Sequence, residues 1–308
     1  MNRIFRNTVA VSIIIAAVVF LNGCIIFKIV ANQGPTEKVE KVENLKVPSG
    51  DTTIRVHIFT PVGKVPFPIL VYSHGGGWMR GDVYTHGKVC RYLANKVGCI
   101  VVSVDYRKAP KYKFPIPAED AYAALQWTVS HAAQLDGDPA RVAVGGDSAG
   151  GNISAAVCLT AKERGGPKII FQLLVYPPTD LSSLDTESYR KYGTGYDLTK
   201  AHVEKCRDKY LRTIEDRPNP YASPLLVKDL SKLPPALIIT GEYDVVRDEG
   251  ERPMQTVLIR QECRLAHSDA RKSGMALRSG QWLQAWFKMP SMKLYLPYAR
   301  LLVTDKRA

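Results

Sequence analysis

The serine at position 148 stands in a pattern that suits a nucleophile. Residues 146–150 read GDSAG, follow the short apolar run 142–144 and precede a helical pattern. A serine between a strand and a helix occupies a tight, strained turn, so its close neighbours must lack bulky side chains. The start of the helix also directs free N–H groups toward negative charge that develops beside the serine. We therefore predict that Ser148 is a nucleophile in acyl transfer.

A second pattern suits the stabilisation of negative charge. Residues 74–78 read HGGGW and follow the apolar run 67–72. Consecutive glycines let the backbone approach a ligand closely and point N–H donors at it, as an oxyanion hole requires. The end of a parallel strand is also where such sheets bind ligands. His74 comes too early for the order serine, acid, histidine, so we expect it to order the loop by hydrogen bonding.

Apolar runs rich in β-branched residues alternate with helical patterns along residues 51–251. The expected strands are residues 52–59, 67–72, 99–104, 141–144, 169–175 and 236–240, and the clearest expected helices are residues 118–135 and 152–164. This alternation predicts a mainly parallel sheet with helices on both faces. Residues 180–230 are polar, aromatic and irregular, which favours a cap or lid inserted over the sheet. The polar residues 31–50 are predicted to form a linker before the domain.

These motifs, in this order, resemble the hormone-sensitive-lipase-like family of esterases. The resemblance runs from about residue 56 to residue 251, and it includes the segments DYR at 105–107, FPIP at 114–117, YP at 176–177 and LPP at 233–235. It implies an α/β-hydrolase fold with a cap, and hydrolysis of uncharged esters with short to medium acyl chains. It also implies that neither a metal nor a cofactor is needed.

The resemblance assigns roles to further residues. It implies that the backbone N–H groups of Gly76, Gly77 and Ala149 form the oxyanion hole. Asp244 directly follows the expected strand 236–240 and the segment GEY at 241–243. By the same resemblance, Asp244 is the acid that orients a catalytic histidine.

The histidine is where the chain departs from the family. The family places it beyond the acid, usually as His-Gly-Phe, at a position where residues 272–277 read KSGMAL. His267 is the only histidine after Asp244, and it lacks the flanking residues of the family. We also expect no strand in the tail before this point, although the fold calls for one. Two alternatives to esterase activity stay open: a protein that binds or is slowly acylated without turnover, and a serine peptidase on the same fold.

A change of reading frame explains this departure. Residues 252–308 carry eleven Lys and Arg against three Asp and Glu, which gives this tail most of the chain's net charge of +13. The DNA after about codon 252 can be read in a shifted frame that starts at the third base of each present codon. The codons of that shifted frame permit Tyr-Ala, Ala-Gly-Val and His-Gly-Phe at the places where the family shows them. We predict that residues 252–308 form a frameshifted tail.

The N-terminus has the layout of a secretory signal. Arg3 and Arg6 precede the apolar run 9–21, and residues 21–24 read LNGC. This resembles a bacterial lipoprotein box in which Cys24 is lipidated. The alternative is an uncleaved membrane anchor, because apolar residues resume at 25–27. In both cases residues 1–30 associate with a membrane, and the catalytic domain lies on its non-cytoplasmic face.

The distribution of basic residues and the spacing of the cysteines argue against three other classes: nucleic-acid-binding proteins, cysteine-ligated metal proteins and disulfide scaffolds. Because the excess of basic residues lies mostly in the tail, we do not expect nucleic-acid binding. The six cysteines, at positions 24, 90, 99, 158, 206 and 263, have neither metal-ligand spacing nor the density of a disulfide scaffold. Apart from Cys24, they are expected to be buried free thiols.

Overall fold

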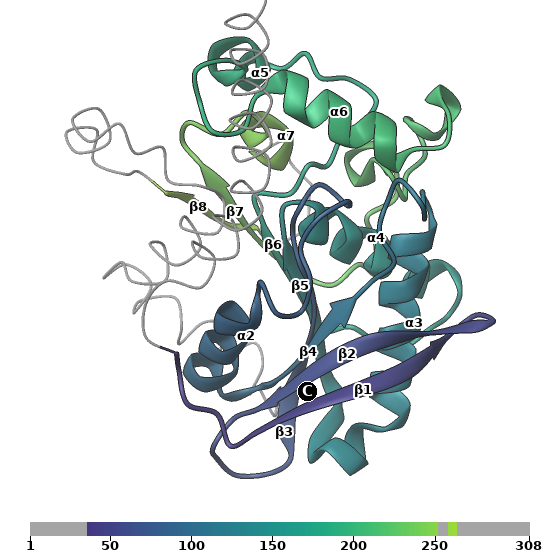
Figure 1. Ribbon diagram of the computed structural model, residues 1–308, viewed down its shortest axis with the longest axis vertical. Coiled ribbons are helices and arrows are strands. Elements are labelled where there is room, and N and C mark those ends of the chain that lie inside the picture. The colour runs from purple at the N-terminus through teal and green to yellow at the C-terminus, as the bar shows by residue number, and fades with distance from the viewer. Residues whose placement is uncertain (1–35, 252–257, 264–308) are drawn as a thin grey trace, which may run out of the picture.

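The computed structural model describes residues 36–251 and 258–263 (Figure 1). The predicted signal segment with Cys24, most of the predicted tail and His267 lie outside these residues. Within the described part of the chain, no helix is long and apolar enough to cross a membrane.

The described residues form one sheet of eight strands in the order β1-β2-β4-β3-β5-β6-β7-β8. The strands are β1 (Lys41–Ser49), β2 (Thr52–Thr60), β3 (Phe67–Ser73), β4 (Ile100–Asp105), β5 (Gly137–Asp147), β6 (Phe171–Val175), β7 (Ala236–Gly241) and β8 (Leu258–Cys263). Only the pairings of β2 with β1 and β4 are antiparallel. The predicted α/β fold with a mainly parallel sheet is therefore confirmed.

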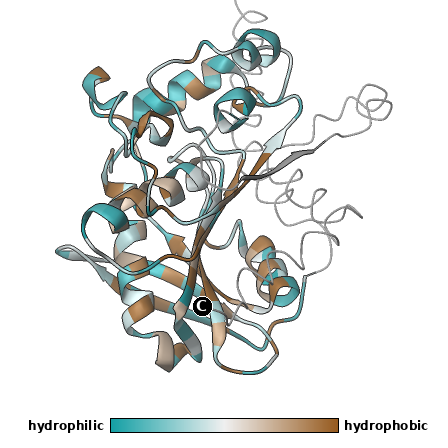
Figure 2. Cartoon of the chain, turned by 180° about the vertical axis from the view of Figure 1, so that it is seen from behind, coloured by the Kyte–Doolittle hydropathy of each residue, from teal (hydrophilic) through white to brown (hydrophobic). Residues whose placement is uncertain are grey.

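Helices cover both faces of this sheet. Their bounds are α2 (Gly87–Leu93), α3 (Ile116–Ser130), α4 (Ala149–Glu163), α5 (Glu187–Tyr192), α6 (Lys200–Tyr210) and α7 (Arg247–Glu251), with shorter helical turns at Ala94–Gly98, Ala132–Leu135, Ile214–Asp216 and Pro224–Leu226. One hydrophobic core joins α3 and α4 to the strands, and a second joins α2 to the opposite face. Figure 2 shows hydrophobic residues along the central strands, as burial on both faces requires.

The strand order determines where a site can form. From β3 the chain moves to β4 on one side, and then returns to β5 on the other side of β3. Ligands bind in such sheets where the order reverses, at the carboxyl ends of the strands. The two motifs identified in the sequence follow the ends of β3 and β5, so they lie next to each other.

Two expectations about the edges of the sheet were wrong. Residues 31–50 were predicted to be a linker, but residues 41–49 form β1, which joins β2 through a tight turn at Gly50. Alternate residues of β1 are partly or fully buried, and its lysines suit an edge strand, so the polar composition concealed the alternation. The tail was predicted to lack a strand, but residues 258–263 pair in parallel with β7. Main-chain pairing at an open edge does not depend on an apolar pattern.

The segment between β6 and β7 carries the region predicted as a cap. It contains α5 and α6, which lie with α7 at one end of the sheet in Figure 1. Asn152 of α4 fixes the base of this segment, because its side-chain amide donates to the carbonyl oxygens of Pro178 and Ala222, each at 2.9 Å.

Candidate active site

Ser148 occupies the turn between β5 and α4 in a strained backbone conformation. Its φ of 53° and ψ of −123° are unusual for a residue with a side chain. The N–H of Ser148 donates to the carbonyl of Val175 at 2.8 Å, and its own carbonyl accepts from the N–H of Asn152 at 3.1 Å. The neighbouring strand and the first turn of α4 therefore hold this conformation in place.

The glycines on each side of Ser148 are required by close packing. A Cβ atom on Gly146 would lie 2.3 Å from the carbonyl oxygen of Ser73, and one on Gly150 would lie 1.9 Å from the same atom. The end of β3 thus passes directly against the serine turn. The motif therefore needs glycine at both positions because a side chain would have no room. Backbone conformation is not the reason, since neither glycine has a positive φ.

The glycine loop after β3 turns sharply and leaves donors free. Gly76 has a φ of +125° and Gly77 a φ of +60°, and the carbonyl of Gly76 accepts from the N–H of Arg80 at 2.9 Å. Among the residues that the structure describes, no acceptor is hydrogen-bonded to the N–H of Gly76 or Gly77. The N–H of Ala149, the first residue of α4, likewise has no partner within its helix.

Asp147 joins the serine turn to the glycine loop. Its buried carboxylate accepts from the hydroxyl of Tyr72 at 2.7 Å and from the N–H of Gly75 at 3.1 Å, and it lies 3.4 Å from Nε2 of His86. Burial alone would raise the pKa of Asp147, but His86 and the hydroxyl of Tyr72 bring it below its usual value. Burial alone would lower the pKa of His86, but Asp147 raises it above its usual value. The two residues therefore form a buried pair in which each favours the charged form of the other.

His74 is a neutral part of the loop. Its ring is fully buried, stacks on Tyr106 at 4.3 Å and contacts the carbonyl of Gly75 through Nδ1 at 2.8 Å. Burial, together with the nearby His86, lowers the pKa of His74 to about 3. This geometry agrees with the prediction that His74 orders the loop.

Asp244 lies in the turn that follows β7. One carboxylate oxygen accepts from the N–H of Val246 at 3.1 Å. Burial raises the pKa of Asp244 to about 6, and the backbone hydrogen bonds from Val245 and Val246, which lower the pKa, offset only part of this rise. In the described part of the chain, no side chain is hydrogen-bonded to this carboxylate. In a catalytic triad this partner is an imidazole. His267 lies outside the described residues.

Comparison with known proteins gives the family. A family model described as alpha/beta hydrolase fold matches residues 70–265, which include both motifs and Asp244. The chain belongs to the hormone-sensitive-lipase-like family of α/β-hydrolases.

Individual members of this family are similar over much of the chain. A carboxylic ester hydrolase of Mycobacterium tuberculosis is 43% identical over 72% of this chain and 60% of its own length, and an arylesterase of Saccharolobus solfataricus is 36% identical over 73% of each chain. The chain spans 60–63% of the first curated relatives that it matches. The structure of a hyperthermophilic esterase from Pyrobaculum calidifontis matches 92% of this chain and 88% of its own, with a TM-score of 0.76 and 34% identity.

The cap of this family member rests on the glycine loop. The ring of Tyr210 in α6 stacks on Trp78 of the loop with 4.4 Å between the ring centroids and 5° between their planes. A Cβ atom on Gly77 would lie 2.6 Å from Sγ of Cys206, also in α6. The cap helix therefore covers the loop that carries the predicted oxyanion donors.

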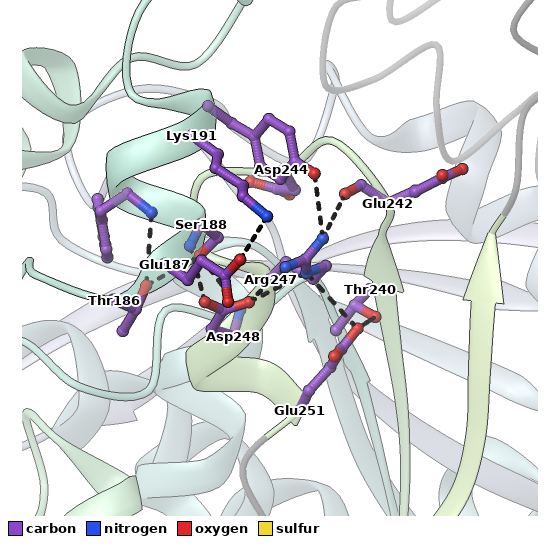
Figure 3. A network of polar contacts seen from close by, with 12 residues as sticks. Thr186, Glu187, Ser188, Lys191, Thr240, Glu242, Asp244, Arg247, Asp248 and Glu251 are labelled. Atoms are coloured by element: carbon purple, nitrogen blue, oxygen red, sulfur yellow. Dashed lines mark hydrogen bonds and ion pairs between the residues drawn. The ribbon is translucent and has the colours of Figure 1, made fainter.

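The cap is also tied to the turn that carries Asp244. The hydroxyl of Ser188 in α5 donates to the carbonyl of Val245 at 2.8 Å. The N–H of Ser188 donates to Asp248 of α7 at 2.7 Å (Figure 3). Asp248 also pairs with Arg247 at 2.8 Å. Figure 3 shows these contacts converging from α5, α7 and the end of β7.

A buried carboxyl group strengthens this connection. Glu249 of α7 accepts from the N–H groups of Thr179 and Asp180, at 2.8 and 2.6 Å, and from the hydroxyl of Tyr189 at 2.7 Å. Burial raises the pKa of Glu249 to about 8.

The sequence assigns no role to Asp147, His86 or Glu249, although Asp147 lies within the GDSAG motif. Their partners lie at least 60 positions away in the sequence, so the motif marks the position of Asp147 but not its contacts. Among residues 36–251 and 258–263, no group of three or more side chains of the metal-binding types is placed to hold a metal ion.

Proposed function

We propose that this chain is built to cleave carboxylic esters through an acyl intermediate on Ser148. The observation that carries the proposal is the hydrogen bond from Gly75 to Asp147, because it holds the glycine loop against the strained serine turn. The similar proteins named as ester hydrolases, arylesterase and esterase support the same chemistry.

The reaction follows from this arrangement. The Ser148 oxygen bonds to the ester carbonyl carbon, and the carbonyl oxygen becomes an oxyanion that accepts from the N–H groups of Gly76, Gly77 and Ala149. The C–O bond to the alcohol then breaks, and the alcohol leaves with a proton. Water attacks the acyl-serine, releases the carboxylic acid and restores the hydroxyl. A base that moves these protons accelerates both steps.

The proposed substrates are uncharged esters with short to medium acyl chains. Tyr192 and Tyr196 of the cap region and Tyr243 beside Asp244 form a group of rings with centroids 5.4–6.2 Å apart. These rings offer apolar area beside Asp244, and the guanidinium of Arg247 already lies over one of them, 5.3 Å from the ring centroid of Tyr192.

A second candidate function is a site that becomes acylated without efficient turnover. Two observations favour it: Asp244 has only backbone hydrogen bonds in the described residues, and residues 272–277 contain no histidine. The loss of a triad member typically lowers the rate by about 10⁴- to 10⁶-fold.

Hydrolysis assays distinguish these functions. We expect the chain to hydrolyse p-nitrophenyl butyrate near the background rate, to lose that residual rate in Ser148→Ala, and to leave a chromogenic peptide intact. Efficient peptide cleavage that requires Ser148 would instead support a peptidase. Brisk ester turnover that is abolished by His267→Ala would make His267 the base and exclude the second function.

We further propose that the reading frame changes near codon 252. The match to the family ends at residue 265, within the tail whose composition changes at residue 252. Sequencing of the gene should find an inserted or deleted base near codons 250–254. A stop codon before codon 275 in the alternative frame would contradict this proposal.

We also propose membrane attachment through a lipid on Cys24. The support is the position of Cys24 after the apolar run 9–21. Cys24→Ser should abolish acyl labelling and leave an unprocessed precursor. Absence of acyl labelling in the unsubstituted chain, with no difference in size between it and Cys24→Ser, would favour the uncleaved anchor.

A further inference from the structure

The loop that carries the predicted oxyanion donors is held at both of its ends by one carboxylate. The loop covers residues 74–86, between β3 and α2, so Gly75 lies near its start and His86 is its last residue. Asp147 accepts from the N–H of Gly75 through Oδ1 and faces Nε2 of His86 through Oδ2. Tyr72, the second-last residue of β3, donates to Oδ1 as well, at 2.7 Å. Asp147 therefore fixes the start and the end of the loop relative to the neighbouring Ser148.

This contact is buried, where charged groups are costly. The side chains of His86 and Asp147 are each 6% exposed, and buried ion pairs of this kind are often no more stabilising than apolar packing. The other ring nitrogen of His86 contacts the hydroxyl of Thr85 at 3.0 Å, and that hydroxyl donates to the carbonyl of Asp82 at 2.8 Å. Every polar atom of the pair thus has a defined partner, which fixes the orientation of the imidazole.

The folded loop has little room to absorb a displacement at its ends. A Cβ atom on Gly75 would lie 2.3 Å from Oδ2 of Asp147, and one on Gly81 would lie 2.4 Å from the carbonyl oxygen of Gly75. A Cβ atom on Gly76 would lie 2.2 Å from the carbonyl oxygen of Arg80. A shift of Gly75 away from Asp147 would therefore displace the N–H groups of Gly76 and Gly77.

We infer that Asp147 and His86 are positioning residues, which set the distance between the oxyanion donors and Ser148. This inference rests on the proposed function. Neither residue has to contact the substrate, because each acts through the backbone of the loop. A misplacement of about 1 Å in such a site can lower a rate by about 10²-fold.

The test measures how fast Ser148 reacts with an uncharged alkyl fluorophosphonate. The serine oxygen bonds to phosphorus, the P–F bond breaks, fluoride leaves, the hydroxyl proton passes to water, and the phosphoryl oxygen occupies the oxyanion site. We expect His86→Leu to lower the maximal rate of modification by about 10- to 100-fold while the reagent concentration for half-maximal rate changes less than about twofold. His86→Gln, which retains a donor toward Asp147, should recover part of the rate. His131→Gln, at the end of α3, is the matched control and should react like the unsubstituted chain.

A second measurement does not depend on reactivity. Hydrogen exchange should increase in residues 74–81 of His86→Leu and remain unchanged in α4. If His86→Leu does not fold, Tyr72→Phe, which removes one donor to the same carboxylate, should show the same changes to a smaller degree. If Ser148 of the unsubstituted chain is never modified, the proposed function is refuted. The hydrogen exchange of residues 74–81 would then still decide whether Asp147 and His86 hold the loop. Unchanged exchange, or an unchanged maximal rate in folded variants, would overturn the inference.

Discussion

At the ends of β3 and β5, close backbone packing and the carboxylate of Asp147 hold the candidate site, whereas at the end of β7 side chains link the site to the cap. The serine turn packs against Ser73 so tightly that Gly146 and Gly150 have no room for a Cβ atom. Asp244, by contrast, lies in a turn that Ser188 and Glu249 tie to the cap. The glycines of the first region therefore leave no room for a larger residue, whereas the second region depends on side-chain contacts with the cap.

The largest effect should follow from filling the contact between β3 and the serine turn. In Gly150→Ala the added Cβ atom would lie 1.9 Å from a main-chain oxygen, so we expect a loss of about 3 kcal/mol or more in the free energy of unfolding. Gly87→Ala, where a Cβ atom meets nothing within 4 Å, should change it by less than about 1 kcal/mol. Urea unfolding of both variants measures the difference. Equal effects would show that the first region is no tighter than the surface.

The next effect should come from removing the acceptor that joins α7 to the cap. Glu249→Ala leaves two buried N–H groups and the hydroxyl of Tyr189 without their acceptor, so we expect a loss of about 2–4 kcal/mol. Glu187→Ala, which removes an exposed carboxylate from α5, is the control and should have a much smaller effect. Thermal unfolding of both variants measures the loss. A loss in Glu249→Ala no larger than in the control would contradict the role of this link.

The same carboxyl group should make stability depend on pH. Burial raises the pKa of Glu249 to about 8, so the folded chain retains a proton that the unfolded chain releases at lower pH. Stability from this group is therefore present below the unfolded pKa and falls as the pH rises toward 8. Glu249→Gln should remove this loss and be more stable than the unsubstituted chain at pH 9 by about 1–3 kcal/mol. Parallel pH profiles for the two proteins would contradict the prediction.

The smallest effect should follow from Asp244→Asn. Because no imidazole contacts Asp244 in the described part of the chain, this substitution should change the rate of Ser148 modification by less than about threefold, whereas removal of the acid from a working triad costs about 10⁴-fold. The rate of reaction with a fluorophosphonate measures it. A loss of 10²-fold or more would show that a histidine is paired with Asp244.

The contrast between the two regions also explains what the sequence could predict. Ser148 and the loop at 74–78 depend on residues that are neighbours in the chain, so their turn and their positions at strand ends were correctly anticipated. The family and the mainly parallel sheet followed from the same local patterns. Cys90, Cys99, Cys158 and Cys206 are buried free thiols, as their spacing suggested.

Long-range contacts between polar side chains could not be anticipated. Asp147 meets His86 across 61 positions and Glu249 meets Thr179 across 70, and nothing in either neighbourhood marks the partner. The strand β1 was missed for a related reason: its burial depends on pairing with β2, while its own composition is that of a solvated segment.

The most direct test of the central claim is mass spectrometry of the intact chain after treatment with an alkyl fluorophosphonate. The account predicts one adduct per chain, located on Ser148, and none in Ser148→Ala, even though ester turnover stays near background. The adduct should form more slowly in His86→Leu than in His131→Gln. The absence of any adduct, or an adduct that persists in Ser148→Ala, would contradict the claim that this fold presents Ser148 as a nucleophile beside an oxyanion hole.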